Sequence, residues 1–188
     1  MESTRSALVS SAVELFTKRG YAGTSLDEIA KRARVTKGAL YHHFSGKQAL
    51  FEAAFEQVES ALFGRLEDIM RGPEPPWERA LAGLREFVSS CLEPAYQRIA
   101  IHEAPVVMGW ERWREAGDKA SFGLIRTGLE DLIAAGEVDD VPVEITARLV
   151  FGALSSAATE IAGSPDPEQA GAQVESVIMQ LLSRVRRA

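Results

Sequence analysis

Apolar side chains recur at intervals of three and four residues along nearly the whole chain, which is the spacing of one face of an α-helix. The first such face consists of Leu8, Ala12, Leu15 and Phe16. We find no convincing run of alternating apolar and polar β-branched residues that would predict a strand. The pattern therefore predicts an all-α fold of about nine to ten helices.

Capping residues, glycines and prolines divide this pattern into helices. Gly20 is placed to end the first helix. A second helix over residues 25–33 has two overlapping candidate caps, Thr24 with Asp27 or Ser25 with Glu28. Thr36 is the predicted N-cap of a third helix over 36–43, and a long helix over 47–71 ends at the Gly-Pro-rich segment 72–76. Six more helices are predicted over residues 77–92, 95–103, 105–116, 118–135, 142–162 and 167–186.

Charge is distributed unevenly along the chain. The whole sequence of 188 residues carries a net charge of −6, but residues 1–50 carry eight Lys and Arg against four acids. A basic N-terminal quarter on an acidic protein predicts an anionic partner that touches this quarter alone. Chance clustering of cations on a solvated face is the alternative.

The second and third helices, joined by the tight turn Ala33-Arg34-Val35, fit a helix-turn-helix, whose second helix enters the DNA major groove. Leu40 and Phe44, four residues apart, are expected to face the core. Lys37, Tyr41 and His42 are then expected to face away from the core, as base and phosphate contacts require. The small residues Gly38 and Ala39 let the helix backbone approach the groove closely. A buried helix position is the alternative for Tyr41.

The stretch from Gly20 to Ala30, followed by Val35 to Phe44 and then Lys47, resembles the DNA-binding domain of the TetR family of bacterial repressors. The resemblance covers about residues 5–55. It implies a homodimer that binds double-stranded DNA at a palindromic operator, with the rest of the chain serving ligand binding and dimerisation. The positions that match DNA-contacting positions of the family are Ser25, Thr36, Lys37, Gly38, Ala39, Tyr41, His42, His43 and Lys47.

Arg34 departs from the family pattern, which has glycine at this turn position. A non-glycine residue with positive φ costs on the order of 1 kcal/mol. Either the turn geometry differs, or the strain is retained in exchange for an added cation near a phosphate. We favour the second interpretation and include Arg34 among the DNA-binding candidates.

Residues 77–135 concentrate large aromatic and polarisable side chains, and all three tryptophans of the chain lie there. Ligand pockets in helical bundles are mostly apolar with a few polar groups. Simple core packing is the alternative for each residue. The predicted contacts to a small apolar or amphipathic effector are Phe87, Cys91, Tyr96, His102, Met108, Trp110, Trp113 and Phe122.

The last two predicted helices are apolar or small nearly all round, so they must be buried on more than one side. A second copy of the chain would provide that burial, whereas packing within the chain is the alternative. The predicted dimer contacts are Phe151, Gly152, Ser155, Ser156, Thr159, Val174, Val177, Ile178 and Leu181.

These features predict a ligand-responsive repressor with a DNA-binding domain over residues 1–46 and a ligand-binding and dimerisation domain over 47–188, connected by the helix 47–71. A constitutive DNA-binding protein without an effector is the alternative, and an all-α enzyme acting on a hydrophobic substrate is disfavoured. One cysteine and three histidines give no metal or catalytic pattern, so we expect no cofactor. No signal peptide or membrane segment is predicted, which favours a cytoplasmic protein.

Overall fold

The structure is a computed structural model that describes residues 3–187, without the side chains of residues 118–120. Its regular structure is helical, and the described residues contain no strand beyond one isolated antiparallel bridge between Val138 and Arg186. The predicted all-α class is confirmed. The elements are α1 (Thr4–Arg19), α2 (Leu26–Arg32), α3 (Lys37–His43), α4 (Lys47–Met70), α5 (Pro76–Cys91), the π-helix η1 (Tyr96–Glu103), α6 (Ala104–Val107), α7 (Trp110–Ala134), α8 (Val143–Gly163) and α9 (Pro167–Val185).

The chain divides into two compact units. The N-terminal unit comprises the chain up to Ala61 together with Glu93–Arg114, and the C-terminal unit comprises Leu62–Leu92 together with the chain from Glu115 onward. Segment 93–114 thus packs with the helices of the N-terminal unit although it is distant in sequence. The predicted functional boundary between residues 46 and 47 stays a prediction, because packing units and functional domains need not coincide.

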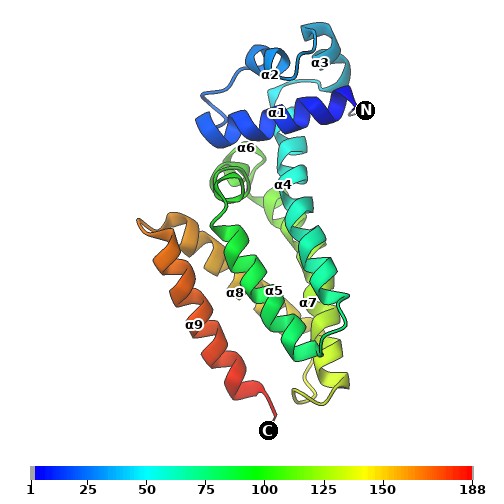
Figure 1. Ribbon diagram of the computed structural model, residues 1–188, viewed down its shortest axis with the longest axis vertical. Helices are drawn as coiled ribbons and strands as arrows, with labels where there is room; N and C mark the ends of the chain where they lie inside the picture. The colour runs from blue at the N-terminus through cyan, green and yellow to red at the C-terminus, as the bar shows by residue number, and fades with distance from the viewer. Residues whose placement is uncertain (1–2, 188) are drawn as a thin grey trace. The chain divides into compact units, whose positions relative to one another are not determined.

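In the N-terminal unit, α1, α2 and α3 pack against one another (Figure 1). Their apolar faces meet in a core of fully or almost fully buried side chains that includes Leu8, Phe16, Ile29 and Leu40. Phe51 of α4 joins this core, with its ring centroid 5.3 Å from that of Phe16 in a T-shaped arrangement. The core therefore fixes the three short helices against the start of α4.

The ends of α1 and α2 follow the predicted signals. Gly20 ends α1 with φ +73°, a conformation that glycine adopts without steric cost. The cap of α2 is Ser25 with Glu28, in a capping box whose two reciprocal hydrogen bonds are both present. Thr24 is instead buried, and its hydroxyl lies 2.9 Å from the Gly20 carbonyl oxygen. The capping alternative of Thr24 with Asp27 is wrong because the Thr24 side chain is used inside the core.

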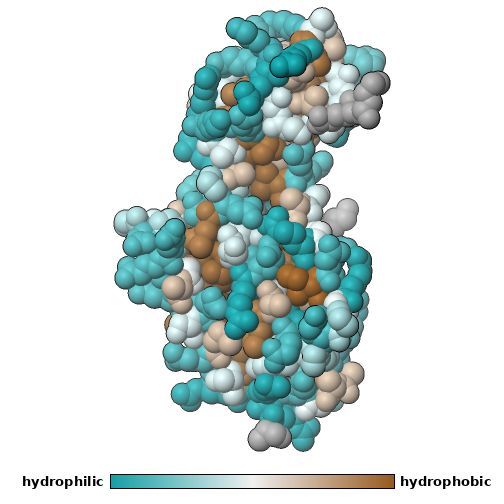
Figure 2. All heavy atoms as spheres, in the orientation of Figure 1, coloured by the Kyte–Doolittle hydropathy of each residue, from teal (hydrophilic) through white to brown (hydrophobic). Residues whose placement is uncertain are grey.

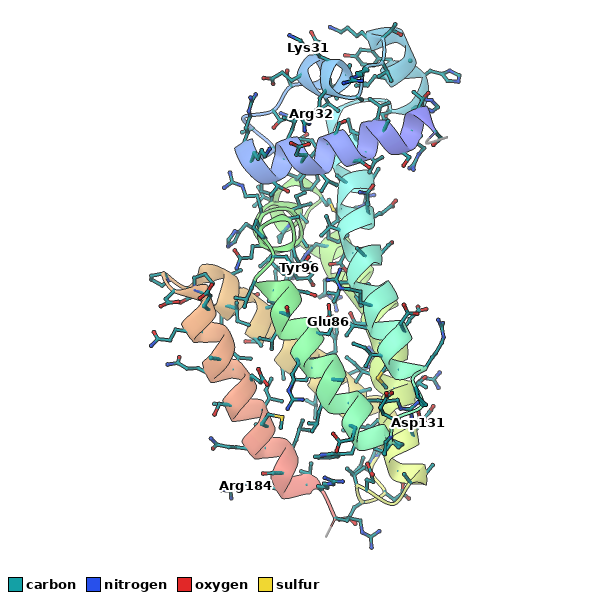
Figure 3. The ribbon with its side chains drawn as sticks, viewed as in Figure 1. Lys31, Arg32, Glu86, Tyr96, Asp131 and Arg184 are labelled. Carbon is teal, nitrogen blue, oxygen red and sulfur yellow. The ribbon has the colours of Figure 1, made fainter. Side chains whose placement is uncertain are left out.

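In the C-terminal unit, α5, α8 and α9 lie side by side (Figure 1). Trp77, Leu81 and Leu132 form a buried cluster, against which Met179 and Leu182 of α9 pack. Most of the surface visible in Figure 2 is hydrophilic, but hydrophobic patches interrupt it in this unit. The Asp131 carboxylate of α7, labelled in Figure 3, accepts a hydrogen bond of 2.8 Å from Arg79 of α5.

Two predicted helices, 105–116 and 118–135, are wrong in their boundaries. The break falls at Gly109, which has φ +89°, so that α6 is a single short turn and α7 runs unbroken from Trp110 to Ala134. Gly117 lies inside α7, where a Cβ atom would be 3.6 Å from the Phe151 ring of α8. This glycine lies within the helix, faces α8 and does not break the helix.

The helix predicted over residues 95–103 is present, but its hydrogen bonding is that of a π-helix. Such turns are rare and occur most often at functional sites. No helix in the described part of the chain combines the length and the hydropathy needed to cross a membrane.

Candidate nucleic-acid interface

The recognition helix candidate α3 is oriented by its apolar residues. Leu40 is completely buried and Phe44 is 5% exposed, so both face the core as predicted. The opposite face carries Lys37, His42 and His43, which are exposed, and Tyr41, which is 51% exposed. The alternative that Tyr41 is a core residue is therefore wrong. At the start of the helix, the Thr36 hydroxyl accepts a hydrogen bond of 3.2 Å from the Ala39 N–H.

The backbone of α3 is accessible near its first turn. Gly38 is exposed, and a Cβ atom there would meet no atom closer than the Thr36 hydroxyl oxygen, 4.0 Å away. Ala39 adds only a methyl group beside it. The two small residues leave room for a close approach of this helix to a groove, as the sequence suggested.

Lys37 is held by an acidic neighbour. Its Nζ lies 2.8 Å from the Asp27 Oδ1 at the start of α2, and both side chains are largely exposed. The hydrogen bond and charge of Asp27 raise the pKa of Lys37, which keeps the ammonium group charged. An exposed ion pair of this kind is weak, so a phosphate or a guanine can replace the carboxylate.

The turn before α3 keeps the backbone conformation that glycine usually provides. Arg34 has φ +57°, and it is the one described non-glycine residue with positive φ. The Val35 N–H donates to the Ala30 carbonyl and the Arg34 N–H donates to the Lys31 carbonyl, which is the double hydrogen bond of a Schellman motif. The turn geometry is thus retained with its strain, and the exposed Arg34 side chain is available to a partner.

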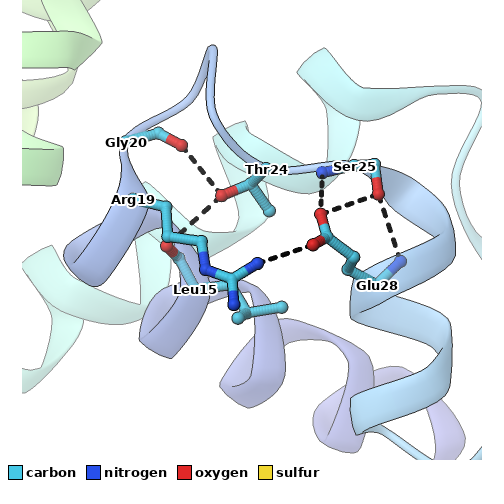
Figure 4. Close-up of polar contacts among 6 residues, drawn as sticks. All are labelled: Leu15, Arg19, Gly20, Thr24, Ser25 and Glu28. Carbon is cyan, nitrogen blue, oxygen red and sulfur yellow. Dashed lines mark hydrogen bonds and ion pairs between the residues drawn. The ribbon is translucent and has the colours of Figure 1, made fainter.

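Ser25 and its neighbours form a polar network at the start of α2 (Figure 4). The Ser25 hydroxyl donates to Glu28 Oε2 at 2.8 Å, and Arg19 Nη1 lies 2.6 Å from Glu28 Oε1. Hydrogen bonds from Ser25 and the charge of Arg19 lower the pKa of Glu28. Ser25 is exposed, so a phosphate at this helix end could compete for its hydroxyl.

Lys47, at the first position of α4, is partly buried, and its Nζ lies over the Tyr21 ring, 4.4 Å from the ring centroid. Two other cations near this site are held in ion pairs within the unit. Arg32 of α2 donates a hydrogen bond of 2.6 Å to Glu14 of α1, and Lys18 pairs with the same carboxylate. The outward cations of α2 and α3 are thus a subset of those counted in the sequence.

The predicted effector contacts are spread over several elements of both units. In the N-terminal unit, Tyr96 is buried and Trp110 stacks on Trp113 with ring centroids 4.9 Å apart. His102 is exposed and Trp110 is 62% exposed, so these two side chains are not in a closed core. In the C-terminal unit, Cys91 is completely buried and Phe87 and Phe122 are partly buried. Whether these residues contact an effector stays a prediction, as it does for the partly buried Met108.

The predicted dimer contacts lie on α8 and α9, which pack against each other and against α5. Gly152, Ser156 and Thr159 are exposed, as are Val177 and Leu181, at 56% and 60%. Phe151 instead faces α7 at Gly117. The remaining candidates, partly buried in the single chain, are Ser155, Val174 and Ile178.

Three further apolar side chains of α8 and α9 are exposed, namely Ile145, Leu149 and Val185. Leu149 and Val185 belong to the apolar runs that predicted an interface, whereas sequence reasoning missed Ile145. Their exposed fractions are 54%, 68% and 57%. Ile145 and Leu149 continue the helical spacing to Gly152 and Ser156, and this periodicity could have identified Ile145. Ala147, Ala158 and Ile161 are buried within the chain. One face of these helices therefore packs within the chain, as one alternative predicted. The other face is apolar and exposed, as a contact with a second copy would require.

Among the described residues, no group of three or more His, Cys, Asp or Glu side chains is arranged to hold a metal ion. The feature best developed in the N-terminal unit is instead a helix-turn-helix with an outward polar face. This defines the class of protein: a helix-turn-helix DNA-binding protein, as found in transcriptional regulators.

Comparison with known proteins specifies the family. Residues 8–54 match the family model of bacterial regulatory proteins of the tetR family, and residues 77–185 match the tetracyclin repressor-like C-terminal domain. The chain belongs to the TetR family of transcriptional regulators, and its family is one of regulators rather than enzymes.

Individual relatives agree with this assignment. The chain is 27% identical over 154 residues to the transposon Tn10 TetC protein of Escherichia coli, a match that covers 80% of this chain and 76% of TetC. It is 30% identical over 125 residues to the transcriptional repressor KstR2 of Mycolicibacterium smegmatis, covering 66% of this chain and 57% of KstR2. A TetR-family regulator from Pectobacterium atrosepticum has a similar structure, with a TM-score of 0.86, 32% identity and coverage of 98% of this chain and 95% of that chain.

Proposed function

We propose that this regulator is a homodimeric repressor that binds a palindromic operator through α3 of each copy and releases it when a small apolar or amphipathic molecule binds. The observation that carries the DNA-binding part is the outward face of α3, where Lys37, Tyr41 and His42 are exposed while Leu40 is completely buried. Repression rather than activation is supported by the similarity to KstR2, which is named a repressor. We place this activity in the cytoplasm, where bacterial DNA lies.

The proposed dimer rests on the exposed apolar side chains of α8 and α9. Five large apolar residues of these two helices are more than half exposed: Ile145, Leu149, Val177, Leu181 and Val185. Soluble monomers seldom expose apolar residues in such a group, and a two-fold dimer would cover the same face of both copies. A dimer in turn requires an operator with two-fold symmetry.

The proposed effector response depends on the distance between the two recognition helices. Successive major grooves on one side of DNA repeat at about 34–36 Å, so a displacement of a few ångströms in the dimer weakens binding. α4, which begins directly after the helix-turn-helix, is the element expected to transmit this displacement. The aromatic residues of segment 77–135 are the proposed contacts for the effector.

Selection of bound sequences from a random DNA pool at two salt concentrations tests the proposal. We expect enrichment of an inverted repeat, with affinity that falls as salt rises because phosphate contacts release counterions. Salt-sensitive binding that enriches no sequence would contradict the operator and leave a non-specific DNA-binding protein. An enriched repeat would also provide the DNA with which to screen apolar compounds, and a protein that no compound displaces would be the constitutive alternative.

A further inference from the structure

One carboxylate joins the π-helix η1 to the helix-turn-helix. Glu103, the last residue of η1, accepts a hydrogen bond of 2.8 Å from the backbone N–H of Tyr21 at its Oε2. Its Oε1 accepts a hydrogen bond of 3.1 Å from Arg98 Nε, also of η1. The side chain of Glu103 is only 17% exposed, so this is a largely buried charge with both oxygens in use.

The backbone at Gly20 is shaped around this contact. A Cβ atom at Gly20 would lie 2.5 Å from Glu103 Oε1 and would also overlap the Arg98 guanidinium group. Gly20 is therefore required both for its positive φ and for the close approach of the Glu103 carboxylate. The carboxylate lies beside the C-terminal end of α1, where the helix dipole disfavours negative charge, and Arg98 offsets that repulsion.

Tyr21 connects this contact with the DNA-binding side of the unit. Its ring packs edge-on against Phe51, with centroids 5.3 Å apart, and supports Lys47 on its face. Lys47 is one of the candidate contacts to the DNA backbone. A continuous path of contacts thus runs from the Glu103 carboxylate through Tyr21 to Lys47.

Two further side chains fasten the same segment. Arg112 at the start of α7 makes a bidentate ion pair with Glu52 of α4. Its Nη1 lies 2.9 Å from Glu52 Oε1, and its Nη2 lies 3.1 Å from Glu52 Oε2. Trp113 Nε1 donates a hydrogen bond of 2.7 Å to the Ala100 carbonyl of η1. The Arg112 ion pair joins segment 93–114 to α4, and the Trp113 hydrogen bond joins the start of α7 to η1 within the segment. Glu103 makes the hydrogen bond from this segment to the loop that leads into α2.

We propose that Glu103 is a positioning residue for DNA binding, which ties η1 to the Gly20–Tyr21 backbone and transmits displacement of η1 to the helix-turn-helix. The inference rests on the proposed function, since it assigns a regulatory contact to that DNA-binding site. η1 is a π-helix, a rare conformation that is found frequently at functional sites. A shift of η1 moves the carboxylate, and with it the start of the loop before Ser25 and the Tyr21 ring that supports Lys47.

The test compares Glu103→Ala, Glu103→Met and Glu103→Gln with the wild-type protein. Alanine and methionine remove the acceptor, and methionine keeps the side-chain length, whereas the glutamine amide oxygen can still accept from the Tyr21 N–H. Glu111→Ala is the matched control, because it removes an exposed carboxylate of the same unit. Amide hydrogen exchange at Tyr21, affinity for the selected inverted repeat and thermal unfolding are measured for each protein.

We expect exchange at Tyr21 to become about tenfold faster and operator affinity to fall about tenfold in the alanine and methionine variants, the effect of losing a hydrogen bond to a charged group. Glutamine should restore operator affinity to within about threefold of wild type, and Glu111→Ala should match wild type. Wild-type affinity in both the alanine and methionine variants, with fast exchange at Tyr21, would overturn the positioning role. If the wild-type protein itself selects no repeat, the proposed function fails instead, and exchange at Tyr21 still tests the contact.

Discussion

Single residues on the outward face of α3 carry the proposed DNA recognition. Tyr41 is half exposed although it is aromatic, and Leu40 beside it is completely buried, so the two residues serve different purposes. Exposed aromatic and basic side chains on a recognition helix contribute binding free energy without contributing to the core. Stability and DNA affinity should therefore respond independently to changes on this face.

Replacing Tyr41 or Lys37 with alanine should weaken operator binding by about 1–3 kcal/mol, the cost of losing one base or phosphate contact. The thermal unfolding midpoint should stay near that of wild type, because neither side chain is buried. Fluorescence anisotropy with labelled operator and calorimetry measure the two quantities. Tyr41→Phe is the matched control for the hydroxyl group, and equal losses of stability and affinity would show that these are core residues.

Glu59 of α4 is a carboxyl group whose pKa differs from its ordinary value. Burial raises its pKa from 4.5 to about 7, and a hydrogen bond from Tyr96 offsets this only in part. Between pH 4.5 and 7 the carboxyl group is protonated in the folded protein and ionised in the unfolded chain. The free energy of unfolding therefore falls as pH rises through that range.

Replacing Glu59 with glutamine removes that dependence. At pH 8 the variant should be more stable than wild type by up to about 3 kcal/mol, and at pH 4.5 the two proteins should be nearly equal. Urea unfolding at several pH values measures the difference. Glu56→Gln, which changes an exposed glutamate of the same helix, should show no such pH dependence. An equal difference at both pH values would contradict the assignment.

At the scale of elements, the turn between α2 and α3 shows what the sequence could and could not specify. The family pattern located the turn, but it left open whether Arg34 changes its geometry. The structure retains the Schellman hydrogen bonds with Arg34 at φ +57°. The backbone of the turn is fixed by the packing of the helices on both sides, so the residue adapts to the turn.

Arg34→Gly should therefore stabilise the fold by up to about 1 kcal/mol, because glycine adopts positive φ without steric cost. The same change should weaken DNA binding, if the guanidinium group contacts a phosphate, and reduce the salt dependence of binding by about one counterion. Arg34→Asn keeps tolerance for positive φ and removes only the charge, so it is the appropriate control. Unchanged DNA affinity in both variants would show that Arg34 contacts no phosphate.

Helix boundaries were predictable where capping chemistry is local and were wrong where it depends on tertiary packing. Gly20, Ser25 and Thr36 end or begin helices through contacts within a few residues. The sequence identified Gly20 and Thr36, and it gave Ser25 as one of two alternative caps. Gly109 and Gly117 are the same residue type, but Gly117 packs against Phe151 of a distant helix. Nothing local distinguishes the two glycines, so their roles could not be assigned from the sequence.

The candidate site shows a similar division. Exposure of the α3 face followed from its periodicity, because Leu40 and Phe44 identify the inward side. The pairing of Lys37 with Asp27, and the contact of Glu103 with the Tyr21 backbone, join residues from separate elements. Contacts of this kind depend on the packing of helices, which a single sequence does not reveal.

At the scale of the whole molecule, the exposed apolar residues of α8 and α9 require a partner. Gly152 is exposed, and a Cβ atom there would meet nothing within 4 Å. Gly152→Leu should therefore leave the folded single chain intact and obstruct a close helix contact between two copies. Analytical ultracentrifugation should show a monomer or a weakened dimer, and operator affinity should fall with it.

Gly123→Leu provides the control for that experiment. Gly123 is also exposed, with no atom within 4 Å of a Cβ atom, but it lies on α7 outside the proposed interface. This variant should keep the mass and DNA affinity of the wild-type protein. An unchanged dimer in Gly152→Leu would place the interface elsewhere.

The most direct test of the central claim is the affinity of the wild-type protein for the selected inverted repeat and for a copy whose half-sites are about five base pairs further apart. Five base pairs are about half a turn of DNA, so the change turns one half-site to the opposite side of the duplex. A dimer that presents two α3 helices on one side should bind the altered repeat at least about a hundredfold more weakly, close to its non-specific affinity. Equal affinity for the two DNAs would contradict a dimeric regulator that reads both half-sites at once.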